Sequence, residues 1–284
     1  MVREFAAPAK INLCLHVLGR RADGYHDLHM LMQRVSLADR VVIALRDEPG
    51  VEVECPGVDL ASGEQNIAAR AARVVLAAAG RGLGARICID KRIPVAAGLG
   101  GGSSDAATVM VGLNRMLGAP LAREALLREG ARLGADVPFF VFGRPAWATG
   151  VGDRLRRVAA LPPVWYVLVN PGFAVSTAWV YGNLRLTSPL DVAKLPEFFS
   201  SPDDLVRLLH NDLEQVTIAR YPQIADIKER LVAAGALGAL MSGSGPTVFG
   251  LFDDEALAGA AQAQLSRNPE WRVFKVSPVV DTEV

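Results

Sequence analysis

A run of glycines followed by two serines is the segment of this chain best suited to bind a phosphate. Glycines let the backbone approach a ligand closely and adopt positive φ, and their N–H groups can surround an anion. A helix that begins behind them would add the positive end of its dipole. The segment comprises Pro94, Val95, Ala96, Ala97, Gly98, Leu99, Gly100, Gly101, Gly102, Ser103 and Ser104. We interpret it as a phosphate-binding loop before a helix that starts at Ser103 or Ser104.

Two familiar phosphate loops are excluded by the spacing. The chain contains no Gly-Lys dipeptide, so the loop is not a Walker A motif. A Rossmann fingerprint that starts at Gly98 would need glycine at position 103, which is serine. A flexible turn before a serine-capped helix remains the alternative. For Asp105 we favour a helix-capping role over a contact with magnesium.

Four other segments carry residues that could do chemistry, and each has an ordinary structural alternative. Lys10 and Asn12 share one side of a predicted strand, although a lone lysine there is commonly a solvated edge charge. Asp136 follows a predicted helix and could be a turn or cap residue. Tyr25 and His26 at a turn could stack on a ligand or cover the core. The segment comprising Ser242, Gly243, Ser244 and Gly245 is either a hairpin turn or a second backbone approach to phosphate.

Composition limits the kind of ligand. The 284 residues include 30 basic and 30 acidic side chains, so no net field favours nucleic acid or an anionic membrane. Three dispersed cysteines argue against disulfides and zinc clusters and favour a reducing compartment. The four histidines form no H-x-x-x-H pair, which argues against a transition-metal site. With no signal-peptide layout and no long apolar run, we expect a cytoplasmic enzyme.

The order of the predicted elements favours an α+β fold over a doubly wound parallel sheet, because strands dominate the first 60 residues. We expect Ile11, Leu13, Leu15 and Val17 to share one strand face. Helices are predicted over 66–79, 120–133, 224–234 and 254–265, with Gly134 capping the second. Residues 185–204 are expected to form a long surface connection. We place a domain boundary so that residues 1–158 and 159–284 form two domains.

Three motifs together resemble those of the GHMP kinases. Residues 94–104 read P-x-x-x-G-L-G-G-G-S-S, residues 8–13 read P-A-K-I-N-L, and residues 241–247 read M-S-G-S-G-P-T. They occur in the family's order and span nearly the whole chain. The resemblance implies an N-terminal domain like ribosomal protein S5 domain 2, a ferredoxin-like C-terminal domain, and an active site between them. It also implies ATP as phosphoryl donor, with Mg²⁺.

Residues 19–28 (G-R-R-A-D-G-Y-H-D-L) and 134–138 resemble the branch of this family whose substrate carries a cytidine diphosphate. By that resemblance Asp136 is the catalytic base and Lys10 its partner. Asn12 and His26 would bind the cytosine, and Tyr25 and Tyr181 would stack on it, with Trp179 as a rival for Tyr181. Further residues implied at the nucleotide and substrate sites are Asn66, Lys91, Thr177 and the 242–245 segment.

Three alternatives stay open at this point. The chain could be another small-molecule kinase of the family, of mevalonate or homoserine type, although the Gly24-Tyr25-His26 turn argues against it. It could be a non-catalytic nucleotide-binding regulator, which the joint presence of Lys10 and Asp136 disfavours. An NAD-binding oxidoreductase is disfavoured by the failed Rossmann spacing. The sequence does not identify the metal ligands or decide between a monomer and a homodimer.

Overall fold

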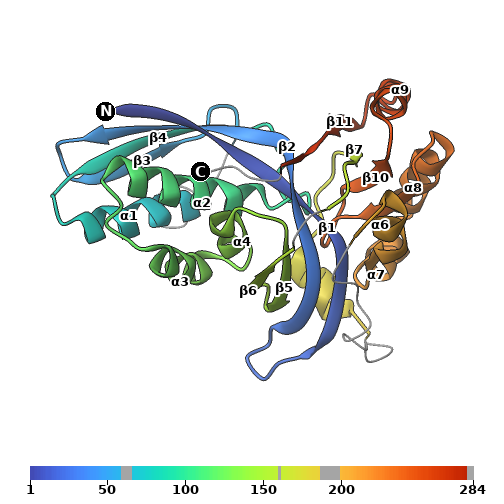
Figure 1. Cartoon of the computed structure of the whole chain (residues 1–284), viewed down its shortest axis with the longest axis horizontal. Coiled ribbons are helices and arrows are strands. Elements are labelled where there is room, and N and C mark those ends of the chain that lie inside the picture. Colours follow the sequence, from blue (N-terminus) through green and yellow to red (C-terminus); the bar gives the residue numbers. More distant parts are fainter. Residues whose placement is uncertain (59–65, 159–160, 186–198, 280–284) are drawn as a thin grey trace.

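The chain forms two antiparallel-rich sheets, each covered by helices (Figure 1). This computed structural model describes residues 1–58, 66–158, 161–185 and 199–279. The first sheet is built mainly from the N-terminal half and the second from the C-terminal half, so the predicted α+β class is confirmed. Within the described residues, no helix combines the length and apolar character needed to cross a membrane.

Two long strands form the backbone of the first sheet. β1 (Val2–Arg20) and β2 (His26–Arg46) pair antiparallel along nearly their whole length, and the turn between them contains Gly24 with φ of +86°. β4 (Gly84–Asp90) pairs with β2 and in parallel with β3 (Gly50–Glu54). β5 (Ala146–Gly150) pairs antiparallel with the first part of β2, and β6 (Arg154–Arg157) pairs antiparallel with β5.

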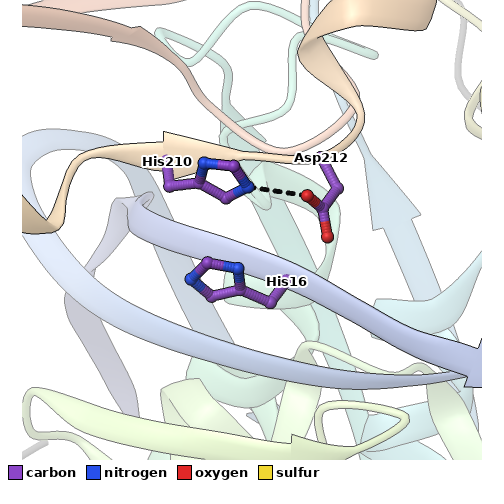
Figure 2. Close-up of side chains that lie close together, drawn as sticks. All are labelled: His16, His210 and Asp212. Carbon is purple, nitrogen blue, oxygen red and sulfur yellow. Dashed lines mark hydrogen bonds and ion pairs between the residues drawn. The ribbon is translucent and has the colours of Figure 1, made fainter. Parts of the chain in front are cut away.

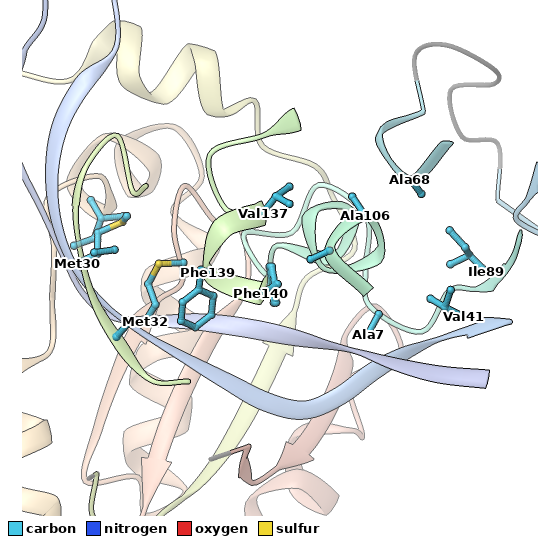
Figure 3. Packing of buried hydrophobic residues seen from close by; sticks show 14 of the residues in the cluster. Ala7, Met30, Met32, Val41, Ala68, Ile89, Ala106, Val137, Phe139 and Phe140 are labelled. Atoms are coloured by element: carbon cyan, nitrogen blue, oxygen red, sulfur yellow. The ribbon is translucent and has the colours of Figure 1, made fainter. Parts of the chain in front are cut away.

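Four helices cover one face of this sheet (Figure 1). They are α1 (Ile67–Ala79), α2 (Gly101–Met116), α3 (Arg123–Leu133) and α4 (Val137–Phe142). Their apolar sides and the facing strand residues form one continuous core, in which Met32 of β2 lies near Phe139 and Phe140 of α4 (Figure 3). α4 begins directly after Asp136, so this core fixes where the Asp136 backbone lies.

The second sheet has the strand order β11-β7-β10-β9, with every neighbouring pair antiparallel. Its strands are β7 (Trp165–Asn170), β9 (Gly238–Met241), β10 (Val248–Phe252) and β11 (Arg272–Val276). α8 (Gln223–Ala233) precedes β9, and α9 (Glu255–Leu265) joins β10 to β11. This is the β-α-β-β-α-β arrangement of a ferredoxin-like domain, which was expected.

The two halves are interlocked through short strands. β8 (His210–Asn211) pairs in parallel with β1, and β12 (Pro278–Val279) pairs with β2, so the C-terminal half contributes both to the first sheet. Between β7 and α8 lie α5 (Thr177–Asn183), α6 (Pro202–Leu208) and α7 (Glu214–Arg220). Neither α5 nor α7 was predicted from the sequence. Most of the 185–204 connection lies outside the described residues, and the 158/159 boundary remains a prediction.

Three local expectations were wrong. The β1–β2 register shifts between Asn12 and Cys14, so the alternation breaks there. Ile11 and Leu13 pack in one apolar cluster whereas Leu15 and Val17 pack in the other, and the four do not share a face. α2 begins at Gly101 rather than at the serines, and its N-cap residue Gly100 supplies no side chain. α3 begins at Arg123, three residues later than predicted, but Gly134 does follow it as the C-cap.

We predict that Phe139→Ala lowers the free energy of unfolding by about 3–5 kcal/mol, because its ring is fully buried and the truncation leaves a cavity. Denaturant unfolding monitored by circular dichroism measures the change. Phe142→Ala is the matched control, since Phe142 is only partly buried on the same helix. Equal losses in the two variants would contradict the role given to this core.

Candidate active site

A cavity of about 1200 Å³ opens between the two halves of the molecule. Its lining comes from β1, the turn before β2, the glycine loop, the start of α2, the residue before α4, α5, and the loop between β9 and β10. Most residues singled out from the sequence therefore meet in one place, although they come from segments as distant as Lys10 and Ser244. A cavity of this size can hold two substrates end to end.

The glycine loop is held against the rest of the site by contacts that leave no room for side chains. A Cβ on Gly98 would lie 2.1 Å from the carbonyl oxygen of Ser242, and one on Gly100 would lie 3.0 Å from Lys10. Both glycines have φ above +60°, a conformation that other residues rarely adopt. The backbone N–H of Lys10 donates to the Leu99 carbonyl over 2.9 Å. The loop is thus a fixed part of the site.

The loop presents the free amino end of α2 to the cavity. No side chain caps this 16-residue helix, so the N–H groups of its first turn remain available to an anion. Gly100, Gly101, Gly102 and Ser103 line the cavity there, and the preceding stretch lines it with Pro94, Val95, Ala96, Ala97 and Gly98. The arrangement suits a nucleotide's phosphates without any lysine in the loop.

Two residues of the predicted loop do not face the cavity. Leu99 is 1% exposed and packs in the apolar cluster that also contains Ile11 and Leu13. Ser104 is completely buried, and its hydroxyl donates to the Pro8 carbonyl over 2.7 Å. The sequence-based assignment of these two residues to ATP is corrected on these contacts, because both side chains instead hold the loop and α2 against β1.

Lys10, Asn12 and Asp136 form a charged group at the centre of the cavity. The Lys10 ammonium donates to Asn12 Oδ1 over 2.6 Å and lies 3.7 Å from Asp136 Oδ2. Lys10 and Asn12 are almost fully buried, while the Asp136 side chain is 30% exposed. Asp136 caps nothing at its helix, so the capping alternative is wrong. A cation therefore stands next to a carboxylate that can reach a ligand.

A second, deeper charge cluster anchors the base of the glycine loop. Lys91 pairs with both Asp39 and Asp105, its Nζ lying 2.6 Å from Asp105 Oδ2. Asp39 Oδ1 accepts from the backbone N–H groups of Arg92 and Ile93. Asp39 lies on β2, Lys91 follows β4 and Asp105 lies in α2, so three elements meet here.

Asp105 is the member of this cluster that is not fully satisfied. Its Oδ1 is buried without a hydrogen-bond partner among the described residues. Burial raises the pKa of this carboxyl to about 7; the nearby Asp39 adds to the rise and Lys91 opposes it. Asp105 and Lys91 both line the cavity. The predicted capping role for Asp105 is wrong, because its carboxylate pairs with Lys91 instead of the helix N–H groups.

Aromatic rings line the opposite end of the cavity. The His26 ring stacks on Tyr181 of α5, with centroids 5.0 Å apart, and the 63% exposed Tyr25 lies beside it in sequence. Burial, and then Arg20, lower the pKa of His26, which keeps its ring neutral with one donor and one acceptor nitrogen. Trp179 lies outside the lining, under the guanidinium of Arg220. Tyr181 is therefore the better placed of the two rivals.

The loop between β9 and β10 is both a hairpin connection and part of the site. Gly243 and Ser244 line the cavity, and the Ser244 hydroxyl lies 2.8 Å from that of Thr177, which also lines it. Ser242 is fully buried and donates to the Gly98 carbonyl over 3.0 Å, so it joins this loop to the glycine loop. Gly245 packs near Met241 and Thr217 and does not reach the cavity.

Asn66 also lies outside the cavity lining. Its side chain accepts from the N–H groups of Ala68 and Ala69 and caps α1, and it is the next residue, Ile67, that lines the cavity. The sequence analysis missed several lining residues. Arg20 lies within a motif that was noticed, whereas apolar residues such as Met30, Val175 and Leu213 carry no signal in the sequence.

Comparison with known families agrees with the motif resemblance. The family model described as GHMP kinases N terminal domain matches residues 66–144, and the one described as GHMP kinases C terminal matches residues 195–270. Among solved structures, a homoserine kinase from Cytophaga hutchinsonii superposes with a TM-score of 0.79 at 19% identity, covering 99% of this chain and 95% of that one. This likeness shows a shared fold.

Relatives with higher sequence identity to this chain than that homoserine kinase share one name. The chain is 59% identical over 280 residues to 4-diphosphocytidyl-2-C-methyl-D-erythritol kinase of Syntrophotalea carbinolica, covering 99% of this chain and all of the relative. The protein of that name from Pelobacter propionicus is 57% identical over 93% of this chain and 95% of its own. A crystal structure of 4-(cytidine 5′-diphospho)-2C-methyl-D-erythritol kinase superposes with a TM-score of 0.82 at 40% identity, covering 97% of this chain and 99% of that one.

The raised pKa of Asp105 predicts a pH dependence of stability. The folded state holds this proton more tightly than the unfolded chain does, so the carboxyl's contribution is complete below about pH 4 and is lost as the pH rises through about 7. Between about pH 5 and about pH 8, the free energy of unfolding should therefore fall more steeply in the wild type than in Asp105→Asn. Urea unfolding across this range measures both slopes.

Asp90→Asn is the control for this experiment, because Asp90 is an exposed carboxyl at the end of β4. This variant should keep the wild-type slope. If Asp105→Asn also kept the wild-type slope, the buried carboxyl would not titrate as the geometry indicates.

Proposed function

The chain belongs to the GHMP kinases, and on that premise we propose that it transfers the γ-phosphate of ATP to the 2-hydroxyl of 4-diphosphocytidyl-2-C-methyl-D-erythritol. The observation that carries this proposal is the position of the Lys10–Asp136 pair. It lies between the free end of α2, which suits phosphates, and the Tyr25–His26–Tyr181 group, which suits a base.

Phosphoryl transfer depends mainly on alignment and on stabilising the charge of the transferred group. The rigid glycine loop and the open end of α2 would hold the ATP phosphates. At the far end, binding the cytosine would fix the acceptor hydroxyl in line with the γ-phosphate. Alignment of this kind supplies up to about 7–11 kcal/mol in favourable cases. Binding of the cytidine diphosphate, far from the reacting atoms, thus supplies free energy that lowers the barrier to phosphoryl transfer.

We assign the chemistry to two side chains. Asp136 accepts the proton of the acceptor hydroxyl as the bond to phosphorus forms, because its carboxylate is the partly exposed acid at the centre of the cavity. Lys10 orients that carboxylate and stabilises negative charge on the transferring phosphoryl. Asn12 was expected to bind cytosine. Asn12 lines the cavity, and its contact with Lys10 Nζ supports a positioning role as well, in which it holds the ammonium beside Asp136.

The aromatic end would recognise the cytosine. Tyr25 and Tyr181 supply ring faces, and a neutral His26 supplies one donor and one acceptor, which matches the mixed donor and acceptor edge of cytosine. Because His26 stacks on Tyr181, the base would enter by displacing or extending this stack. Thr177, Gly243 and Ser244 lie between the two ends of the cavity and are placed to contact the substrate diphosphate.

Magnesium fits this site through Asp105. Asp105 lines the cavity, its buried Oδ1 lacks a hydrogen-bond partner among the described residues, and carboxylate oxygens with phosphates are the ligands that Mg²⁺ prefers. When bound, the ion neutralises charge on the nucleotide phosphates.

The three cysteines are all free, which supports a reducing, cytoplasmic location for an enzyme that uses ATP. We further propose residues 1–158 and 159–284 as its two domains.

A substrate panel tests the proposed activity. ADP release with magnesium and ATP is measured against the cytidyl methylerythritol, mevalonate, homoserine and galactose. Turnover with the first compound alone is expected, with the new phosphate identified on the 2-hydroxyl by ³¹P NMR. Turnover with another acceptor would indicate a different kinase of the family, and no turnover with any would indicate a nucleotide-binding regulator.

For Asp136→Asn we predict a fall in kcat of about 100-fold or more with ATP affinity within about twofold of the wild type, because proton acceptance is lost while the phosphate contacts remain. Steady-state kinetics and equilibrium nucleotide binding measure the two effects. Asp226→Asn, at an exposed position of α8 outside the cavity lining, should retain wild-type kcat. Near-normal turnover by a folded Asp136→Asn enzyme would exclude Asp136 as the base.

For Tyr181→Ala we predict a rise of about tenfold in KM for the cytidyl substrate with KM for ATP unchanged, because stacking on a base contributes about 1–3 kcal/mol. Trp179→Ala, two residues away and outside the cavity, is the matched control and should leave both values near those of the wild type. A larger effect of Trp179→Ala than of Tyr181→Ala would reverse the assignment of the stacking residue.

A further inference from the structure

A second cluster of reactive side chains lies where the two halves of the chain meet on β1. His16 of β1, His210 of β8 and Asp212 just beyond β8 gather beside one another (Figure 2). Each offers one atom that can bind a metal, and these three atoms lie within 4.8 Å of one another. None of the three lines the proposed active site, so the kinase reaction does not account for them.

His16 is a largely buried imidazole that stacks on a second histidine. It is 9% exposed and makes no hydrogen bond within the described part of the chain, and its ring stacks on that of His210 with centroids 4.5 Å apart. A neutral imidazole without a hydrogen bond has a nitrogen lone pair available to a metal.

The other two ligands are already held together. His210 Nε2 lies 2.6 Å from Asp212 Oδ1, while Asp212 Oδ2 accepts from the backbone N–H of Val17 over 2.7 Å. The second contact fixes the orientation of the carboxylate, as the supporting contacts around protein metal ligands commonly do. One oxygen of Asp212 is thus committed to the fold and the other points at His210.

We propose that His16, His210 and Asp212 form a binding site for a divalent transition metal ion, with Zn²⁺ as the best-suited occupant. Two imidazoles and one carboxylate are a common zinc ligand set, and with bonds of about 2.0–2.2 Å a tetrahedral ion places its ligand atoms about 3.3 Å apart. The ion would enter between His210 and Asp212, and the His16 ring would turn out of its stack. Water would fill the fourth position.

The surroundings allow an ion to enter from solvent. His210 has a 51% exposed side chain and borders a separate hollow of about 590 Å³, whose lining also includes Asn211, Glu214 and Lys228. Mg²⁺ would not compete, because it prefers oxygen ligands. Mg²⁺ at the ATP phosphates and Zn²⁺ at this cluster would therefore occupy different sites, because the two sites lie apart and offer different ligand atoms.

An ion at this site would join the two halves of the chain. β8 belongs to the C-terminal half and pairs with β1, and the neighbouring residues Leu15 and Leu213 line the active-site cavity. We therefore expect bound zinc to stabilise the folded chain, because it binds the native arrangement and not the unfolded one. The histidines lie in opposite halves of the sequence, which is why spacing gave no sign of the site.

The test uses the full-length protein after treatment with a chelator. Isothermal titration with ZnCl₂ should show one site per chain, and the melting temperature should rise with zinc concentration but not with MgCl₂. His210→Gln should weaken zinc binding by at least about tenfold. His26→Gln is the matched control, and it should bind zinc as the wild type does because His26 lies outside the cluster.

A second readout does not depend on any variant folding. Co²⁺ in place of Zn²⁺ should give the visible absorption of a four-coordinate ion in the wild-type protein, and ZnCl₂ should displace it. Absence of that absorption together with no saturable zinc binding would overturn the proposal. Equal zinc affinity of wild type and folded His210→Gln would also overturn it.

Discussion

The active site of this protein depends on how one buried ammonium is held. Lys10 lies on a strand that is otherwise packed in the core, and its ammonium has two partners there, Asn12 and Asp136. Its backbone N–H also holds the Leu99 carbonyl, and its side chain fills the space that a Cβ on Gly100 would need. The same residue thus positions the phosphate loop through its backbone and the acidic group through its side chain.

The remaining structure fixes the three segments that meet at Lys10. The core around Phe139 sets the start of α4 and so the position of Asp136. The buried Asp39–Lys91–Asp105 cluster joins β2, the end of β4 and α2, and so fixes both ends of the glycine loop. Ser242 connects the loop between β9 and β10 to Gly98. A cavity between two domains is thereby made rigid on its phosphate side, and Tyr25, His26 and Tyr181 lie at the other end.

The sequence predicted the kinase family, the two-domain α+β fold and most of the cavity lining, because these follow from motifs and from strong local patterns. It failed where a long-range contact decides the outcome. The bulge between Asn12 and Cys14 depends on pairing with β2, so strict alternation was the wrong expectation. Asp105 looked like a helix cap because its partner Lys91 lies on another element. Ser104 looked like a phosphate donor, yet its hydroxyl is taken by Pro8.

In the proposed mechanism, Lys10 and Asp136 act as one unit on the transferred phosphoryl group. A double-mutant cycle on kcat/KM with Lys10→Met, Asp136→Asn and the combined variant tests it most directly. Residues in contact that share a function are strongly non-additive. We expect the double variant to lose far less activity than the product of the two single losses. A loss equal to that product would show that the two residues act independently, which would exclude this joint role.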